Sequence, residues 1–175
     1  LDFLLPERAA GRLPSPLECD LAAWRLRAAR AGLDRHPVLR GLDAFLAANE
    51  PRDASHALLH GDPNPGNYLV GPPGVVAVVD WEIAAIGDPR SDLGFYAALV
   101  SMFGGMPGQA GRTVLSHAYE AATGRPLFHL DYYEGVGLYK MAVVLAGWGG
   151  RAGAGYALEA VSRRLSVLFG PSWAA

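Results

Sequence analysis

The sequence has 175 residues, of which 51% are hydrophobic and 18% are charged, a composition that predicts a folded domain and excludes an intrinsically disordered chain. The net charge is −2 and no run of lysine or arginine occurs, so neither nucleic acid nor an anionic membrane is the expected partner. A single cysteine, Cys19, excludes an internal disulfide. Neither a signal-peptide pattern nor an apolar stretch of about eighteen residues is found, so we expect a cytoplasmic protein.

Two helices are predicted in the first fifty residues. Residues 15–18, with the sequence SPLE, have the form of a capping box with proline at the first helical position. They predict a helix over 16–31 that ends near Gly32. Apolar residues recur with the helical period over 37–49, which predicts a second helix ending before Pro51.

The pattern changes after residue 56. A short apolar run at 57–59 leads into a loop of sequence HGDPNPGN at 60–67, whose proline and glycine content excludes a helix. Two β-prone segments, 68–70 and 75–79, flank the sequence GPPG and predict a β-hairpin. Asp80 is therefore expected at the end of a strand.

The remainder of the chain is predicted to be helical. Asp88 followed by proline predicts a helix start, and this helix is expected to reach Gly104. The pair Gly149-Gly150 is expected to separate the last two helices. The predicted fold class is α+β and mainly helical, with one small β-hairpin beside the loop. The three later helices are expected at 109–122, 131–148 and 153–169.

Loop 60–67 and the residue after the hairpin supply the groups that phosphoryl transfer requires. This reaction needs an acceptor for the proton of the substrate hydroxyl, and oxygen ligands that hold magnesium against nucleotide phosphates. Kinase-type sites place a base Asp and a metal-binding Asn five residues apart on one loop, as Asp62 and Asn67 are, and a second Asp after the next hairpin, as Asp80 is. Together with His60 and Gly61, this spacing would arise by chance in about one of twenty thousand such chains.

These residues carry a resemblance to a known family. The stretch HGDPNPGNYLV, followed by VVAVVDWEIAAIGDPRSDLGFY, is similar to the C-terminal lobe of the aminoglycoside phosphotransferase and choline kinase superfamily. Members of this superfamily have a protein-kinase-like fold. Within it, the sequence most resembles the phosphotransferase branch related to the kinase-like domain of certain acyl-CoA dehydrogenases. The specific motifs cover roughly residues 57–97.

The resemblance implies roles for the residues of the motif. Asp62 would be the catalytic base, Asn67 and Asp80 would bind Mg²⁺ and through it ATP or GTP, and His60 would organise the catalytic loop by hydrogen bonds to the backbone. The implied reaction transfers the γ-phosphate of ATP or GTP to a hydroxyl group of a small molecule. Asp80 is followed by Trp-Glu rather than the Phe-Gly of protein kinases, which argues against protein substrates.

Several of these residues also have purely structural explanations. Asp88 could act only as a helix cap and Asp92 only in a salt bridge, although the resemblance implies that Asp92 and the segment 87–89 brace the loop. Asp and Asn are common in turns. A zinc site formed by His56 and His60 would require a helix in a segment that contains glycine, so we do not expect one.

The nucleotide-binding side of such an enzyme is not recognisable in the sequence. Kinases cover the phosphates with a loop of an N-terminal β-lobe, where a strand lysine pairs with a helix glutamate. The only lysine here is Lys140, on a predicted late helix. We therefore expect residues 1–175 to form one domain, a C-terminal lobe without its nucleotide-binding lobe. Self-association is expected through apolar residues of the uncovered interface, for example Leu1, Phe3, Leu4 and Leu5.

Three functions remain open at this point. The first is a phosphotransferase lobe, incomplete in this chain, with its small-molecule substrate between the loop and the late helices. The second is a kinase-like fragment that binds a ligand or partner without catalysis. The third is a metal-assisted hydrolase that uses the same carboxylates without a nucleotide.

Overall fold

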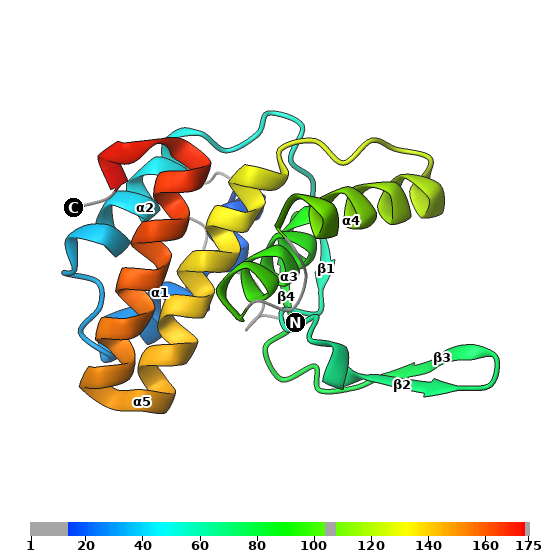
Figure 1. Cartoon of the computed structure of the whole chain (residues 1–175), viewed down its shortest axis with the longest axis horizontal. Helices are drawn as coiled ribbons and strands as arrows, with labels where there is room; N and C mark the ends of the chain where they lie inside the picture. The colour runs from blue at the N-terminus through cyan, green and yellow to red at the C-terminus, as the bar shows by residue number, and fades with distance from the viewer. Residues whose placement is uncertain (1–13, 104–107, 174–175) are drawn as a thin grey trace.

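The computed structural model describes residues 14–103 and 108–173, which form a mainly helical body with two small antiparallel sheets (Figure 1). This is the predicted fold class. None of the described helices is long and apolar enough to cross a membrane. The helices are α1 (Pro16–Arg30), α2 (Pro37–Ala48), α3 (Arg90–Phe103), α4 (Gly108–Thr123) and α5 (Leu130–Phe169); the strands are β1 (Ala57–Leu59), β2 (Tyr68–Gly71), β3 (Gly74–Val78) and β4 (Ala85–Gly87).

Helix α1 begins as the sequence predicts. The Ser15 hydroxyl accepts a hydrogen bond from the Glu18 backbone N–H, and the Glu18 carboxylate accepts one from the Ser15 N–H (2.7 Å). The start of α1 is also tied to the segment after α2, because the Leu17 N–H donates to Glu50 (2.8 Å). The capping box therefore fixes both the first turn of α1 and its place beside α2.

Helix α5 contains 40 residues and folds back on itself. Glu134 near its start accepts a hydrogen bond from Arg164 near its end (Nε–Oε1 2.6 Å), whereas thirty residues of straight helix would span about 45 Å. Figure 1 shows the yellow first half and the orange second half running in opposite directions. The predicted two-helix course is thus confirmed, although the helical backbone continues through the Gly149-Gly150 pair.

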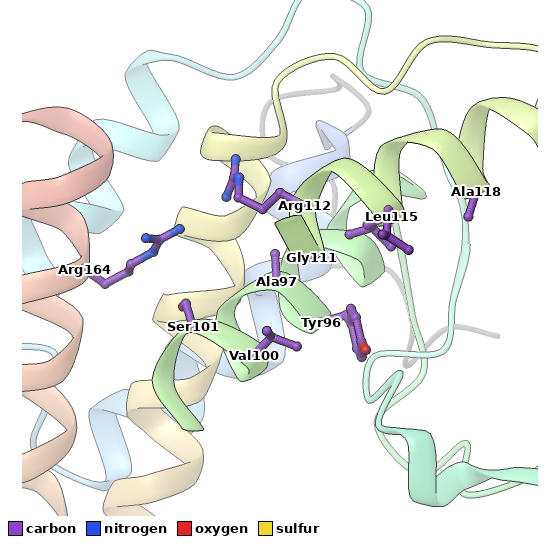
Figure 2. Close-up of a pocket in the computed structure, with 10 residues that line it drawn as sticks. Tyr96, Ala97, Val100, Ser101, Gly111, Arg112, Leu115, Ala118 and Arg164 are labelled. Carbon is purple, nitrogen blue, oxygen red and sulfur yellow. The ribbon is translucent and has the colours of Figure 1, made fainter. Parts of the chain in front are cut away.

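Helices α3 and α5 cross at a point where glycines bring the two backbones together. A Cβ atom at Gly94 would lie 2.0 Å from the Tyr133 carbonyl oxygen, and one at Gly137 would lie 2.6 Å from the Gly94 oxygen. On its other side, α3 faces α4 across an apolar cavity of about 230 Å³ (Figure 2). The close crossing fixes α3, and with it the residues that α3 presents to loop 60–67.

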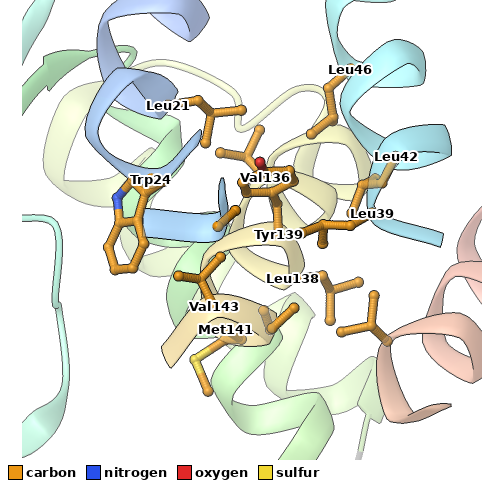
Figure 3. Packing of buried hydrophobic residues seen from close by; sticks show 14 of the residues in the cluster. Leu21, Trp24, Leu39, Leu42, Leu46, Val136, Leu138, Tyr139, Met141 and Val143 are labelled. Atoms are coloured by element: carbon orange, nitrogen blue, oxygen red, sulfur yellow. The ribbon is translucent and has the colours of Figure 1, made fainter. Parts of the chain in front are cut away.

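One hydrophobic core joins α1, α2, α3 and α5 (Figure 3). Leu21 and Trp24 of α1 and Leu42 of α2 pack against the first half of α5. Of the aromatic residues of α5, Tyr132, Tyr133 and Tyr139 are buried, whereas Trp148 is 80% exposed. The first half of α5 is therefore the centre of the molecule.

The two sheets lie in different surroundings. Strand β1 pairs with β4, and β4 packs against α1, since a Cβ atom at Gly87 would lie 2.8 Å from the Cβ atom of Asp20. The hairpin β2–β3 extends away from the helices (Figure 1), and its valines are largely exposed. Helices therefore do not cover both faces of β2–β3 in the described part of the chain. The turn between the two strands lies at the end of the hairpin that points away from the described helices (Figure 1).

Candidate active site

Loop 60–67 follows β1 and depends on a glycine at its second position. Gly61 has φ +87°, a left-handed conformation that strains any other residue, and a Cβ atom there would lie only 2.3 Å from the Ile83 carbonyl oxygen. The loop therefore passes directly against the segment that follows the hairpin. Glycine at this position belongs to the sequence motif, but its close contact with the Ile83 carbonyl could not be predicted from the motif.

His60 connects the loop to the end of the hairpin. Its Nδ1 accepts a hydrogen bond from the Asp62 N–H (3.3 Å), so its Nε2 carries the hydrogen and donates to the Val79 carbonyl (2.8 Å). The buried ring also lies 4.6 Å from the ring of Trp81. Because both nitrogens are engaged with the backbone, this geometry favours the loop-organising role expected for His60.

Asp62 and Asn67 are in direct contact. The Asn67 side-chain Nδ2 donates to the carbonyl oxygen of Asp62 (2.9 Å) and to its carboxylate Oδ2 (3.0 Å). With the amide nitrogen directed at two acceptors, Oδ1 of Asn67 is left for another partner. Oδ1 of Asp62 is likewise left to accept a proton. The expected base and the expected metal ligand thus form a pair with defined orientations.

Asp80 is brought to the same loop through its neighbour Val79. The Val79 N–H donates to the Asn67 carbonyl (2.9 Å), while the Val79 carbonyl accepts from His60. Asp80 itself has φ +67°, which is uncommon for a residue other than glycine, and its side chain is exposed. Both polar groups of the Val79 backbone are therefore bound by residues of loop 60–67, and Asp80 directly follows Val79.

Asp92 of α3 braces the loop from behind. Its two carboxylate oxygens accept the backbone N–H groups of His60 (2.8 Å) and Gly61 (3.0 Å). Burial raises the pKa of Asp92, while these two hydrogen bonds and the charge of Lys140 oppose that rise. The bracing role implied by the resemblance fits this geometry, and a simple surface salt bridge does not.

Asp88 combines the expected capping role with an ion pair that the sequence did not reveal. It accepts from the N–H groups of Arg90 (2.9 Å) and Ser55 (2.8 Å), and its carboxylate binds the Arg90 guanidinium (2.8 Å). Burial disfavours the charged form, yet the bonds from Arg90 and Ser55 hold the pKa of Asp88 below its ordinary value. The Arg90 guanidinium also lies 4.8 Å from the Tyr133 ring.

A cavity of about 490 Å³ opens beside Asp62. It lies between loop 60–67, α1, α3 and the middle of α5. The substrate is expected between this loop and the late helices, and the cavity includes that space. Apart from Asp62, its charged residues are Arg27 and Glu82. Its apolar lining includes Trp24, Ile83, Phe95, Leu99, Phe103, Met141, Val143, Val144 and Trp148.

The cavity between α3 and α4 does not contain any of the predicted site residues (Figure 2). Arg112 and Arg164 lie at one end of it, and both bind the buried carboxylate of Glu134. Its apolar walls include Val100 and Leu115. The cavity beside Asp62, by contrast, is lined by one of the expected site residues.

The site residues fit magnesium rather than a metal held by protein ligands alone. No group of three or more His, Cys, Asp or Glu side chains suited to a metal occurs among the described residues. Magnesium typically takes one or two protein oxygen ligands and completes its shell with water and phosphate oxygens. The free Oδ1 of Asn67 and the exposed carboxylate of Asp80 offer such a pair.

Comparison with known proteins identifies the family of the chain. The sequence model of the phosphotransferase enzyme family (APH) matches residues 4–131. Acyl-CoA dehydrogenase family member 11 from Gallus gallus is 33% identical over 88 residues, which cover 49% of this chain and 11% of that protein. The Homo sapiens protein of the same name is 32% identical over 80 residues, which cover 44% of this chain and 10% of that protein. The chain thus spans about a tenth of these relatives.

Two solved structures share the fold. A candidate aminoglycoside phosphotransferase from Ralstonia eutropha JMP134 superimposes with a TM-score of 0.62 at 23% identity, over 90% of this chain and 55% of that one. Macrolide 2′-phosphotransferase from Brachybacterium faecium gives a TM-score of 0.52 at 29% identity, over 85% of this chain and 51% of that one. The chain therefore spans about half the length of either structure.

Proposed function

Because the chain belongs to the phosphotransferase enzyme family, we propose that it carries the acceptor side of a kinase-like site that transfers the γ-phosphate of ATP or GTP to a hydroxyl group of a small molecule. The observation that carries this proposal is the bond between the Asn67 amide and the Asp62 carboxylate (3.0 Å). This bond uses one oxygen of the Asp62 carboxylate and the amide nitrogen of Asn67, and the backbone of Val79, which precedes Asp80, is bound to the same loop.

In this proposal Asp62 is the catalytic base. Its Oδ2 is held by Asn67, so Oδ1 receives the proton of the substrate hydroxyl. The hydrogen bond from Asn67 fixes the direction of this carboxylate. His60 and Asp92 act by holding the loop backbone, which matters because positioning supplies much of the rate of phosphoryl transfer.

Asn67 and Asp80 are the proposed magnesium ligands. The bound ion would neutralise charge on the phosphates of the nucleotide. Asn67 contributes Oδ1, since its Nδ2 is committed to Asp62. Asp80 contributes an exposed carboxylate at a position fixed by the Val79 backbone.

The cavity beside Asp62 is the proposed acceptor site. Its walls are mostly aliphatic and aromatic, and Arg27 lies 4.9 Å from the Trp24 ring on one side of it. A polycationic amino sugar would need several carboxylates, and among the described residues this cavity supplies only Glu82 besides the base. We therefore propose an acceptor alcohol with an apolar body that carries few charges.

The proposal does not assign any basic side chain to the nucleotide phosphates. Lys140, the only lysine of the chain, is fully buried against Asp20 and cannot reach a phosphate from that position. This observation favours a second candidate function, in which the 175-residue chain binds a ligand or partner without catalysis. We propose that nucleotide binding by this chain alone is weak.

Phosphoryl transfer and nucleotide binding together separate the two functions. The assay follows phosphate transfer from MgATP and MgGTP to a set of apolar alcohols, and calorimetry measures nucleotide binding. Both are applied to the 175-residue chain and to the product of its whole reading frame. Transfer by either form that is lost in Asp62→Asn supports the leading proposal. Ligand binding without transfer by either form supports the second, and turnover without nucleotide would indicate a hydrolase.

A further inference from the structure

The cavity between α3 and α4 has no part in the proposed function. Its volume is about 230 Å³ (Figure 2). Val100 of α3 lines this cavity, whereas the neighbouring residue Leu99 lines the cavity beside Asp62. Because successive residues of a helix point in different directions, α3 forms one wall of each cavity and separates the two.

The walls of this cavity are largely apolar, and small residues leave it open. Val100 and Leu115 line it, while Ala97, Ser101 and Ala118 supply little volume. The Ser101 hydroxyl donates to a carbonyl of its own helix (2.9 Å), so its hydrogen is engaged within α3. An apolar protein cavity of about 150 Å³ already holds benzene. The cavity between α3 and α4 therefore has room for an apolar group somewhat larger than benzene.

Two arginines form the polar end of the cavity. Arg164 of α5 binds the Glu134 carboxylate with two nitrogens (Nε–Oε1 2.6 Å, Nη2–Oε2 3.0 Å), and Arg112 of α4 binds the same carboxylate through Nη1. Arg112 also binds Asp131 through Nη2. Nη1 of Arg164 and Nε of Arg112 do not have a hydrogen-bond partner among the described residues.

The buried charges at this end do not balance. The side chains of Arg112 and Arg164 are 16% and 20% exposed, and Glu134 is fully buried. Asp131 is 59% exposed, so water screens its charge. No other charged side chain lines this cavity in the described part of the chain. Two guanidinium groups thus face one buried carboxylate, and because buried charge is tolerated only when it is paired, this end suits one further anionic group.

We propose that the cavity between α3 and α4 binds a small apolar monocarboxylate, whose head group accepts hydrogen bonds from Arg112 and Arg164 and whose apolar body lies between Val100 and Leu115. The planar donors of arginine match the geometry of a carboxylate. A neutral head group would leave the guanidinium charge unpaired, and a cationic one would be repelled. The expected catalytic residues do not line this cavity, so the inference does not rest on the proposed function.

The experiment titrates the 175-residue chain with hexanoate, hexanol and hexylamine, which share one apolar chain and differ in the charge of the head group. Calorimetry measures their affinities, and NMR follows the methyl signals of Val100 and Leu115. A ligand of about eight non-hydrogen atoms should bind with a Kd of about 1 mM or tighter. We expect hexanoate to bind at least about ten-fold more tightly than hexanol and to shift both methyl signals, and hexylamine not to bind.

Two adjacent substitutions in α3 assign the ligand to one cavity. Val100→Phe fills the cavity between α3 and α4 and should lower the affinity for hexanoate at least about ten-fold. Leu99→Phe is the matched control, because it places a phenyl ring on the wall of the cavity beside Asp62, and it should leave that affinity unchanged. Arg112→Met removes one guanidinium while Arg164 still pairs with Glu134, and should lower the affinity for hexanoate to that for hexanol.

Several results would overturn the proposal. Equal affinities for hexanoate and hexanol would refute the carboxylate preference, and this comparison uses the unchanged chain, so it holds even if Arg112→Met does not fold. Methyl signals that shift first at Ile83 and Val143, or binding that is lost in Leu99→Phe and kept in Val100→Phe, would place the ligand beside Asp62. Absence of hexanoate binding would also refute the site. No phosphate transfer is measured, so failure of the proposed function would not affect this result.

Discussion

The Asn67 side-chain amide donates to the Asp62 carboxylate across 3.0 Å, so the expected metal ligand and the expected base orient one another. Asn67 also accepts the Val79 N–H through its own carbonyl. Asp62 and Asn67 are thereby oriented by hydrogen bonds within the chain, and Asp80, eighteen positions after Asp62, follows a residue that is bound to the same loop.

The two aspartates should have separable roles. In a form of the protein that transfers phosphate, Asp62→Asn should lower kcat by about 10² or more and leave nucleotide affinity nearly unchanged, because it removes only the proton acceptor. Asp80→Asn should also weaken binding of the metal–nucleotide complex. Steady-state kinetics and calorimetry measure the two effects. Equal and small effects of both substitutions would show that the roles are wrongly assigned.

Gly61 should not tolerate a side chain. Gly61→Ala places a methyl group against the Ile83 carbonyl at φ +87°, and should reduce the free energy of unfolding by at least about 3 kcal/mol. Gly32→Ala is the matched control, since Gly32 has φ +71° with nothing within 4 Å, and should lose only about 1–2 kcal/mol. Urea denaturation measures both values. Similar losses would mean that the loop does not press on Ile83.

Asp88 should make stability depend on pH in acid. Its pKa is lowered in the folded protein, so its stabilising contribution is complete above the ordinary value of 3.8 and disappears as the pH falls through the lowered value. Asp88→Asn should therefore lose about 3 kcal/mol at neutral pH and progressively less in acid.

Asp43→Asn provides the control for that experiment. Asp43 binds Arg25 at 2.9 Å, but both side chains are partly exposed, so the loss should stay below about 1 kcal/mol. The comparison uses unfolding free energies from pH 7 down to pH 2. A constant difference between wild type and Asp88→Asn over this range would contradict the assigned ion pair.

The apolar surface of the hairpin should promote self-association. The residues first suggested for this role, Leu1, Phe3, Leu4 and Leu5, lie outside the described residues. Val70 and Val75 are cross-strand partners that are 73% and 60% exposed. Replacing both with Thr keeps β-branched side chains and removes apolar surface, so sedimentation should detect less association, with stability changed by less than about 0.5 kcal/mol. Unchanged association would show that the hairpin does not form the self-association interface.

Local sequence signals predicted the elements that depend on neighbouring residues. The capping box of α1, the start of α3 after Asp88, the glycine-rich turn of β2–β3 and the spacing of Asp62, Asn67 and Asp80 all act within a few residues or within one loop. Such features are encoded where they occur. Local patterns in the sequence therefore predicted most of the helices and the residues of the candidate site.

Contacts between distant helices could not be predicted in this way. Lys140 and Asp20 are 120 positions apart, and each alone suggests a solvated charge on a helix. Their meeting depends on how α1 and α5 pack, which no local pattern records. The exposure of Trp148 depends on the same packing, because it lies on a helix whose other large aromatic residues, Tyr132, Tyr133 and Tyr139, are buried.

Paramagnetic broadening by Mn²⁺ tests the proposed metal site most directly. The ion is added together with ATP or GTP to the isotopically labelled chain, at concentrations that allow weak binding, and backbone amide signals are recorded. We predict that signals of residues 62–67 and 79–81 broaden first, that Asp80→Asn abolishes this effect, and that Asp88→Asn, which alters a carboxylate already bound by Arg90, leaves it in place. Broadening centred elsewhere, or broadening that persists in Asp80→Asn, would contradict a phosphotransferase site built on Asp62, Asn67 and Asp80.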